Sequence, residues 1–143
     1  MSFSLLQIDL DTISMIEELR FDAYDISGID SSKTYYANEI RKGKFIAFGA
    51  FYQGELIGSC YVSNSGSTLY IEQLFVSKAF QKTNLHVGSN LLKYVLSQKD
   101  YIEDYFNCNF HYSCLDSINN TDNLYKRVGY VKTREQLMKK RLY

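Results

Sequence analysis

Residues 70–92 read YIEQLFVSKAFQKTNLHVGSNLL, and this stretch decides the fold of the chain. The apolar run that ends at Val76 is typical of a buried strand, and the apolar residues from Val87 onward recur at helical spacing. A polar loop that ends in small residues joins the two elements. Because the first turn of a helix carries backbone N–H groups without intrahelical partners, a phosphate can bind there. The stretch therefore predicts a strand–loop–helix unit with an anion site at the start of the helix.

The sequence on both sides of this stretch predicts one α/β domain over residues 1–143. The expected strands are Phe3–Ile8, Phe45–Tyr52, Glu55–Ser63, Thr68–Val76, Tyr105–Leu115, Tyr130–Thr133 and Gln136–Leu142. The expected helices run from Asp11 or Thr12 to Ala23, from Ser31 or Ser32 to Gly43, from Val87 to Gln98 and from Asn119 to Val128. Gln53 and Gly54 form the expected hairpin turn, because glycine readily adopts the positive φ that tight hairpins need.

Length and charge narrow the class of protein. A chain of 143 residues is long enough for one core that buries roughly two-thirds of its unfolded surface. Lys plus Arg equals Asp plus Glu at 16 each, so no overall positive field attracts nucleic acid. No apolar run approaches the roughly 18 residues of a membrane span, and the N-terminus lacks the pattern of a secretory leader. We therefore expect a cytoplasmic protein without nucleic-acid or membrane partners.

The three cysteines, Cys60, Cys108 and Cys114, lack the spacing of metal ligands. Cys108 and Cys114 fall on one face of an expected strand, together with Phe110 and Tyr112. We therefore expect all three to be reduced core residues, and no metal site.

Two segments resemble the signatures of the GNAT superfamily of N-acetyltransferases. One is the strand–loop–helix unit described above, and the other is NLYKRVGY at residues 123–130, where Tyr125 is followed four residues later by glycine and an aromatic. The resemblance implies a single-domain fold with a mixed, mostly antiparallel sheet of about seven strands flanked by four helices, in the order β-α-α-β-β-β-α-β-α-β-β. It also implies transfer of an acetyl group from acetyl-coenzyme A to a primary amine.

The same resemblance implies a cofactor site along the strand and the loop. A bulge is expected to splay the strand, so that the pantetheine arm pairs with the backbone of Leu74, Phe75 and Val76. The loop departs from the usual pattern, because it is about two residues longer and retains a single glycine, Gly88. The expected diphosphate contacts are Gln81, Lys82, Asn84, His86, Val87, Gly88 and Ser89. Asn119 is the nearest substitute for an asparagine that contacts the pantetheine arm in the family, and it could equally be a helix cap.

Tyr125 and Glu72 are the expected catalytic residues. The resemblance assigns Tyr125 as the general acid that protonates the leaving thiolate, whereas a residue at this position could also be packing alone. Glu72 interrupts an apolar strand, and burying an unpaired carboxylate costs several kcal/mol, so it is expected to point into a cleft. There it would take the amine proton, directly or through water; the alternative is a salt bridge to a neighbouring strand. His111 is expected to be a hydrogen-bonded filler rather than a catalyst.

The expected acceptor is a small amine or polyamine-like molecule. The first two helices carry acidic and aromatic residues that suit a cation, namely Asp22, Tyr24, Asp25, Asp30, Tyr35 and Tyr36. A protein N-terminus or lysine stays open as the acceptor, as does a coenzyme A-binding module without turnover. A third alternative is an interaction domain for RNA or protein that uses Lys139, Lys140 and Arg141. The resemblance leaves open whether the protein is a monomer or a homodimer.

Overall fold

The computed structural model describes residues 3–9, 15–16, 19, 30–81, 83–116, 122–133 and 137–143. Its strands are β1 (Ser4–Ile8), β2 (Ile46–Tyr52), β3 (Glu55–Ser65), β4 (Thr68–Val76), β5 (Tyr112–Asp116), β6 (Val131–Lys132) and β7 (Leu137–Arg141). Its helices are α2 (Asp30–Arg41), the short 3₁₀ helix η2 (Lys78–Phe80), α3 (Val87–Ser97), α4 (Lys99–Phe106) and α5 (Asp122–Arg127).

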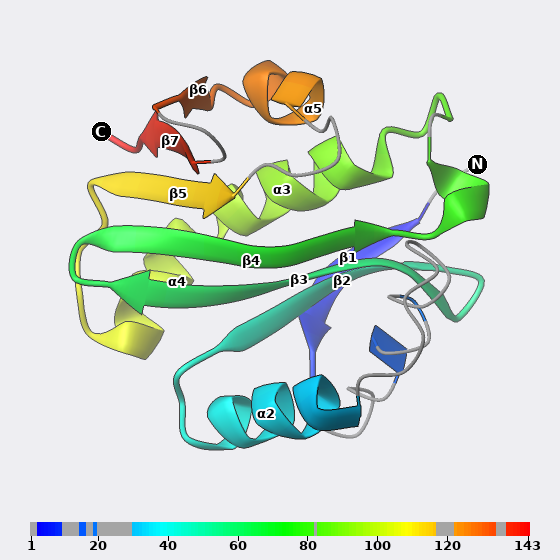
Figure 1. Ribbon diagram of the computed structural model, residues 1–143, viewed down its shortest axis with the longest axis horizontal. Coiled ribbons are helices and arrows are strands. Elements are labelled where there is room, and N and C mark those ends of the chain that lie inside the picture. The colour runs from blue at the N-terminus through cyan, green and yellow to red at the C-terminus, as the bar shows by residue number, and fades with distance from the viewer. Residues whose placement is uncertain are drawn as a thin grey trace.

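The strands form one seven-stranded sheet in the order β1-β2-β3-β4-β5-β7-β6 (Figure 1). Strands β4 and β5 run parallel, and every other neighbouring pair is antiparallel. The predicted fold class, a mixed and mostly antiparallel sheet in one α/β domain, is therefore confirmed. The predicted turn between β2 and β3 is also present, with φ values of 50° at Gln53 and 79° at Gly54.

Helices cover both faces of the sheet, with α2 on one side and α3, α4 and α5 on the other (Figure 1). We call the two sides the α2 face and the α3 face. Because alternate residues of a strand point to opposite faces, Tyr61 packs on the α2 face and Val62 on the α3 face. On the α2 face the ring of Tyr36 stacks on Tyr61 with 4.0 Å between centroids. The α3 face carries the larger core, which includes Leu91, Leu92 and Ile102.

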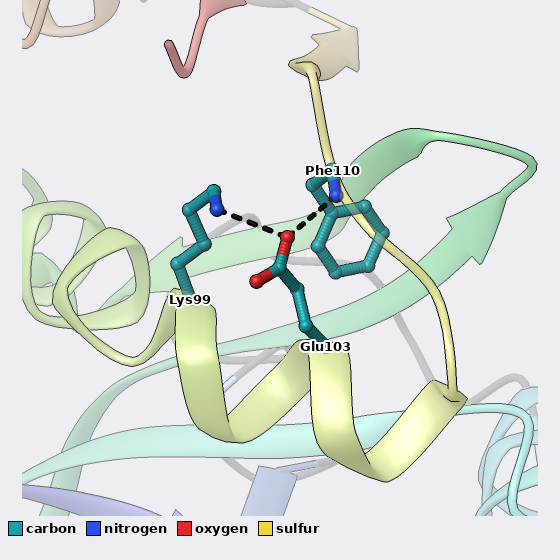
Figure 2. Close-up of polar contacts among 3 residues, drawn as sticks. All are labelled: Lys99, Glu103 and Phe110. Carbon is teal, nitrogen blue, oxygen red and sulfur yellow. Dashed lines mark hydrogen bonds and ion pairs between the residues drawn. The ribbon is translucent and has the colours of Figure 1, made fainter.

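The strand predicted from Tyr105 to Leu115 is wrong in its first half. Residues up to Phe106 belong to α4, and β5 begins only at Tyr112. Glu103 explains the difference, because its Oε2 accepts hydrogen bonds from the backbone N–H of Phe110 at 2.7 Å and from Lys99 Nζ at 2.9 Å (Figure 2). These bonds stabilise a helix followed by a turn where the alternating sequence indicated a strand.

The shorter strand also changes what faces the core. Ser113, predicted on the polar side, is fully buried on the α3 face and shares a 2.6 Å hydrogen bond with the hydroxyl of Tyr130. Cys108 precedes the strand and is only half-buried, which corrects its predicted strand position. Cys60 and Cys114 are free and buried as expected, and burial raises the pKa of the Cys60 thiol to about 12.

The predicted helix before residue 24 lies almost wholly outside the described residues. Of its expected apolar positions, Ile16 and Leu19 are described, and both are buried with the α2 face. Within the described part of the chain, no helix combines the length and apolarity of a membrane span, and no group of three potential metal ligands gathers.

Candidate active site

The parallel ladder between β4 and β5 stops partway along β4. It runs from Thr68 paired with Tyr112 to Ile71 paired with Leu115. Beyond that point residues 72–76 continue β4, whereas β5 ends at Asp116. From Glu72 onward, therefore, β4 continues without pairing with β5.

A β-bulge lies at the same place, as the resemblance implied. Tyr61 of β3 is opposite Glu72 and Ser59 is opposite Phe75, so β4 has one residue more than β3 between these pairs. Gln73 has a φ of 57°, a left-handed conformation that costs a non-glycine residue roughly 1–2 kcal/mol. Strain of this kind is characteristic of functional sites.

The bulge sets which side chains share a face. Glu72 lies opposite Tyr61, and Phe75 packs with Tyr61 in the apolar layer of the α2 face. An unbroken strand would place Glu72 and Phe75 on opposite faces, because Phe75 is three positions after Glu72 and successive side chains alternate. The bulge instead places both side chains on the α2 face, at the point where the β4–β5 ladder ends.

Glu72 is half-buried and held by its neighbour strand. Ser63 of β3 donates a hydrogen bond from its Oγ to Glu72 Oε2 at 3.3 Å. The hydroxyl helps to orient the carboxylate, which therefore has a polar partner at a half-buried position, as burial requires. That Glu72 points into a cleft and that it acts as a base both stay predictions.

Tyr125 lies in α5 and is 5% exposed. Its ring meets that of Tyr130 edge-on, with 6.5 Å between centroids, in the core of the α3 face. Tyr130 itself is structural, because burial raises the pKa of its hydroxyl and Ser113 bonds to it. The packing of Tyr125 is thus established, and its role as a general acid stays a prediction.

The loop after β4 is stabilised by its own side chains. Gln81 Nε2 donates to the carbonyl oxygen of Val76 at 2.7 Å, and Thr83 Oγ1 donates to that of Phe80 at 3.0 Å. At the far end Asn90 Nδ2 donates to the carbonyl oxygen of Leu85 at 3.0 Å. Lys82 and Asn119, both predicted cofactor contacts, lie outside the described residues.

The start of α3 has the features of an anion site. His86, the residue before the helix, is left-handed with a φ of 50° and makes no side-chain cap to the first turn. Among the described residues of the loop, His86 is the left-handed one, and the side chains of Asn84 and His86 are both exposed. Val87 and Ser89 are 1% and 7% exposed, so they would meet a ligand mainly through backbone N–H groups.

Gly88 has a role that sequence reasoning missed. A Cβ added there would lie 2.7 Å from Leu124 Cδ1, so the missing side chain allows α5 to approach α3 closely. Leu124 is the residue before Tyr125. The second signature is therefore packed directly against the first turn of α3.

An open cavity of about 620 Å³ lies near the hairpin that joins β3 to β4. Its lining includes Glu39, Lys44, Ser63 and Tyr105. Ser63 connects this cavity to the candidate site, because the same side chain bonds to Glu72. Sequence reasoning missed Tyr105 here by assigning it to a strand; the Lys99–Glu103 spacing of four residues is the helical signal that could have placed it.

Other predicted acceptor residues separate into two groups. Asp22, Tyr24 and Asp25 lie outside the described residues, and the structure places Asp30 and Tyr35 within α2 without describing their side chains. His111 precedes Tyr112, which pairs with Thr68, so its Cα atom lies roughly 17 Å from that of Glu72. Its backbone N–H donates to Ser67 and its ring meets Tyr143 edge-on, which favours the predicted role as a filler.

Comparisons with known proteins identify the same architecture. The family model described as an acetyltransferase (GNAT) domain matches residues 27–142. The PaiA N-acetyltransferase of Thermoplasma acidophilum, solved in complex with coenzyme A, is 16% identical, with a TM-score of 0.74 and 99% of each chain covered. The ribosomal-protein-S18-alanine N-acetyltransferase of Escherichia coli is 12% identical, with a TM-score of 0.75 and coverage of 99% of this chain and 94% of the other.

A longer protein from Pyrococcus horikoshii also shares the fold. It is 19% identical, with a TM-score of 0.74, and the match covers 92% of this chain but 44% of the other. No curated protein sequence matches this chain significantly. At these identities the solved structures establish the fold alone.

Proposed function

Because this chain belongs to the GNAT acetyltransferase family, we propose that it moves an acetyl group from acetyl-coenzyme A to a primary amine within a ternary complex. The observation that carries the proposal is the bulge at Gln73, at the point where the β4–β5 ladder ends. An extended ligand can add to a sheet as a further strand at such a place. The pantetheine arm of coenzyme A has the amide groups for this pairing.

The cofactor would lie along β4 and end at α3. Leu74, Phe75 and Val76 would offer backbone groups to pantetheine. Gln81 already donates to the Val76 carbonyl, and since a carbonyl oxygen has two lone pairs, this bond orients the group without excluding a second donor. The diphosphate would bind at the uncapped first turn of α3, where the helix dipole favours negative charge.

The chemistry needs two proton movements. Glu72, directly or through water, would take a proton from the acceptor ammonium, and the neutral amine would then attack the thioester carbonyl. The new C–N bond forms and the C–S bond breaks, while the nitrogen loses its remaining extra proton to solvent water. Tyr125 would protonate the departing thiolate, which leaves as the thiol of coenzyme A, and the tyrosinate would then regain a proton from water. Glu72 on the α2 face and Tyr125 on the α3 face would serve the reaction from opposite sides of the sheet.

Calorimetry with acetyl-coenzyme A tests cofactor binding, and release of free thiol in the presence of amines tests turnover. We expect binding in the micromolar range and thiol release with at least one primary amine. Absence of binding at near-millimolar cofactor would overturn the proposal. Binding without thiol release from a broad amine panel would favour a coenzyme A-binding module instead.

A further inference from the structure

The basic residues near the C-terminus do not act as one group. Lys139, Lys140 and Arg141 are consecutive in β7, so alternation sends Lys140 to one face and the other two to the opposite face. Lys140 Nζ donates to the carbonyl oxygen of Val128 at 2.8 Å, just after α5. A cation at the end of a helix stabilises its terminal carbonyls. Lys140 is therefore a structural residue of the α3 face.

Lys139 and Arg141 instead share the α2 face with Glu72. Tyr70, Cys114 and Lys139 are directly opposite one another across β4, β5 and β7. Glu72 follows Tyr70 by two residues, so it points to the same face. Two strand spacings across and two residues along the strand place the Cα atoms of Glu72 and Lys139 about 12 Å apart.

Aromatic rings, rather than carboxylates, hold these two cations. Lys139 Nζ lies 3.9 Å from the centroid of the Tyr112 ring, and Arg141 Cζ lies 4.9 Å from that of Tyr143. The hydroxyls of Tyr112 and Tyr143 are 3.4 Å apart, and the two rings meet edge-on with 6.0 Å between centroids. Among the described side chains neither cation has an acidic partner. A cation–π contact leaves the positive charge uncompensated, so an anion can still bind.

We infer that Lys139 and Arg141 form an anion subsite for the acceptor, so that the preferred amine carries a carboxylate or phosphate roughly 10–15 Å from its nitrogen. The inference rests on the proposed function, because Glu72 defines where the amine reacts. It favours an amphoteric acceptor, such as a short peptide, over the polyamine that composition alone suggested. Two cations also form a footprint too small for nucleic acid.

Three peptides of equal length provide the test. Trialanine places its carboxylate roughly 10 Å from its amine when extended, and trialanine amide differs only in lacking that charge. Ala-Ala-phosphoserine amide carries a phosphate instead, so it separates the two sources of negative charge. We expect kcat/KM for trialanine, for the phosphopeptide or for both to exceed that of trialanine amide about five- to tenfold.

Variants link this preference to the two side chains. In the double variant Lys139→Gln with Arg141→Gln, we expect the ratio of kcat/KM for a charged peptide to kcat/KM for trialanine amide to fall towards one. Raised salt should lower the same ratio in the native protein. Lys93→Gln, an exposed cation of α3, is the control and should keep the native ratio. Equal rates for all three peptides in the native protein, or a preference that survives in the double variant, would overturn the inference.

Backbone-amide NMR keeps the inference separate from the proposed function. If no amine is acetylated, the proposed function fails, and the peptides can still be titrated while the amides of Lys139 and Arg141 are observed. Shifts with a charged peptide and not with trialanine amide would support an anion subsite. No shifts, or shifts with a single-stranded oligonucleotide and with no peptide, would overturn it.

Discussion

Glu103 offers the sharpest test of how this fold is stabilised. Its carboxylate bonds to the buried backbone N–H of Phe110 at 2.7 Å and to Lys99 at 2.9 Å, and the side chain is 14% exposed. Glu103→Gln keeps an acceptor but removes the charge. A hydrogen bond to a charged group contributes about 1.5–3 kcal/mol and a neutral one about 0.5–1.5 kcal/mol. With a few tenths of a kcal/mol for the Lys99 pair, we expect a loss of about 1–2 kcal/mol in the free energy of unfolding.

Glu103→Ala should cost more, because it leaves the Phe110 N–H without an acceptor. Phe110 is 3% exposed, and an unsatisfied buried donor costs about 1–3 kcal/mol. Urea denaturation at pH 7 gives the free energy of unfolding of the native protein, Glu103→Gln and Glu103→Ala, with Asp104→Asn as the control. Asp104 is an exposed acid on the same helix, so its substitution should change stability by less than about 0.5 kcal/mol.

The pH dependence of the Glu103 contribution has a definite sign. The bond from Phe110 and then the bond from Lys99 lower the pKa of Glu103 below its ordinary 4.5. The unfolded chain therefore binds a proton more readily than the native protein, and the stabilisation is fully present above the ordinary pKa. The stabilisation is lost as the pH falls through the lowered pKa that Glu103 has in the native protein. Equal stability of native protein and Glu103→Gln at pH 7, or a difference unchanged at pH 3, would refute this reasoning.

Three further substitutions test the site. Gln73→Gly should raise stability in urea by about 1 kcal/mol, because glycine tolerates the left-handed bulge; a loss would show that the position behaves as ordinary strand. Gly88→Ala should cost about 1–3 kcal/mol by overpacking against Leu124, and a double-mutant cycle with Leu124→Ala should show coupling; additive effects would contradict the contact. Tyr125→Phe should lower kcat about ten- to a thousandfold in the thiol-release assay with little change in cofactor affinity, and native turnover would mean that Tyr125 only packs.

The elements that are set by short-range sequence patterns were predicted correctly. The strand, loop and helix of residues 70–92 follow from apolar spacing, and the turn at Gln53 and Gly54 follows from glycine. The start of β5 does not, because alternation before Tyr112 coincides with a helix end and a turn. The hydrogen bond between Glu103 and Phe110 favours the helix and turn over a strand in this segment. The spacing of apolar residues does not reveal such a contact.

The candidate site was predicted in the same uneven way. The sequence placed Glu72 and the loop correctly on and after β4, because both lie within one continuous segment. It could not show that Ser63 bonds to Glu72, or that Lys139 lies over the ring of Tyr112. These facts depend on register between strands that are distant in the chain, and register is set by the whole sheet.

The close approach of α5 to α3 at Gly88 has a mechanical consequence. Leu124 rests on the first turn of α3, and Tyr125 is the next residue along α5. A helix of six residues is too short to be stable by itself, so its order depends on the residues against which it packs. Any molecule that steadies the first turn of α3 will also damp the motion of α5. Occupancy of the anion site at the start of α3 would then be transmitted to Tyr125 as slower amide exchange across α5.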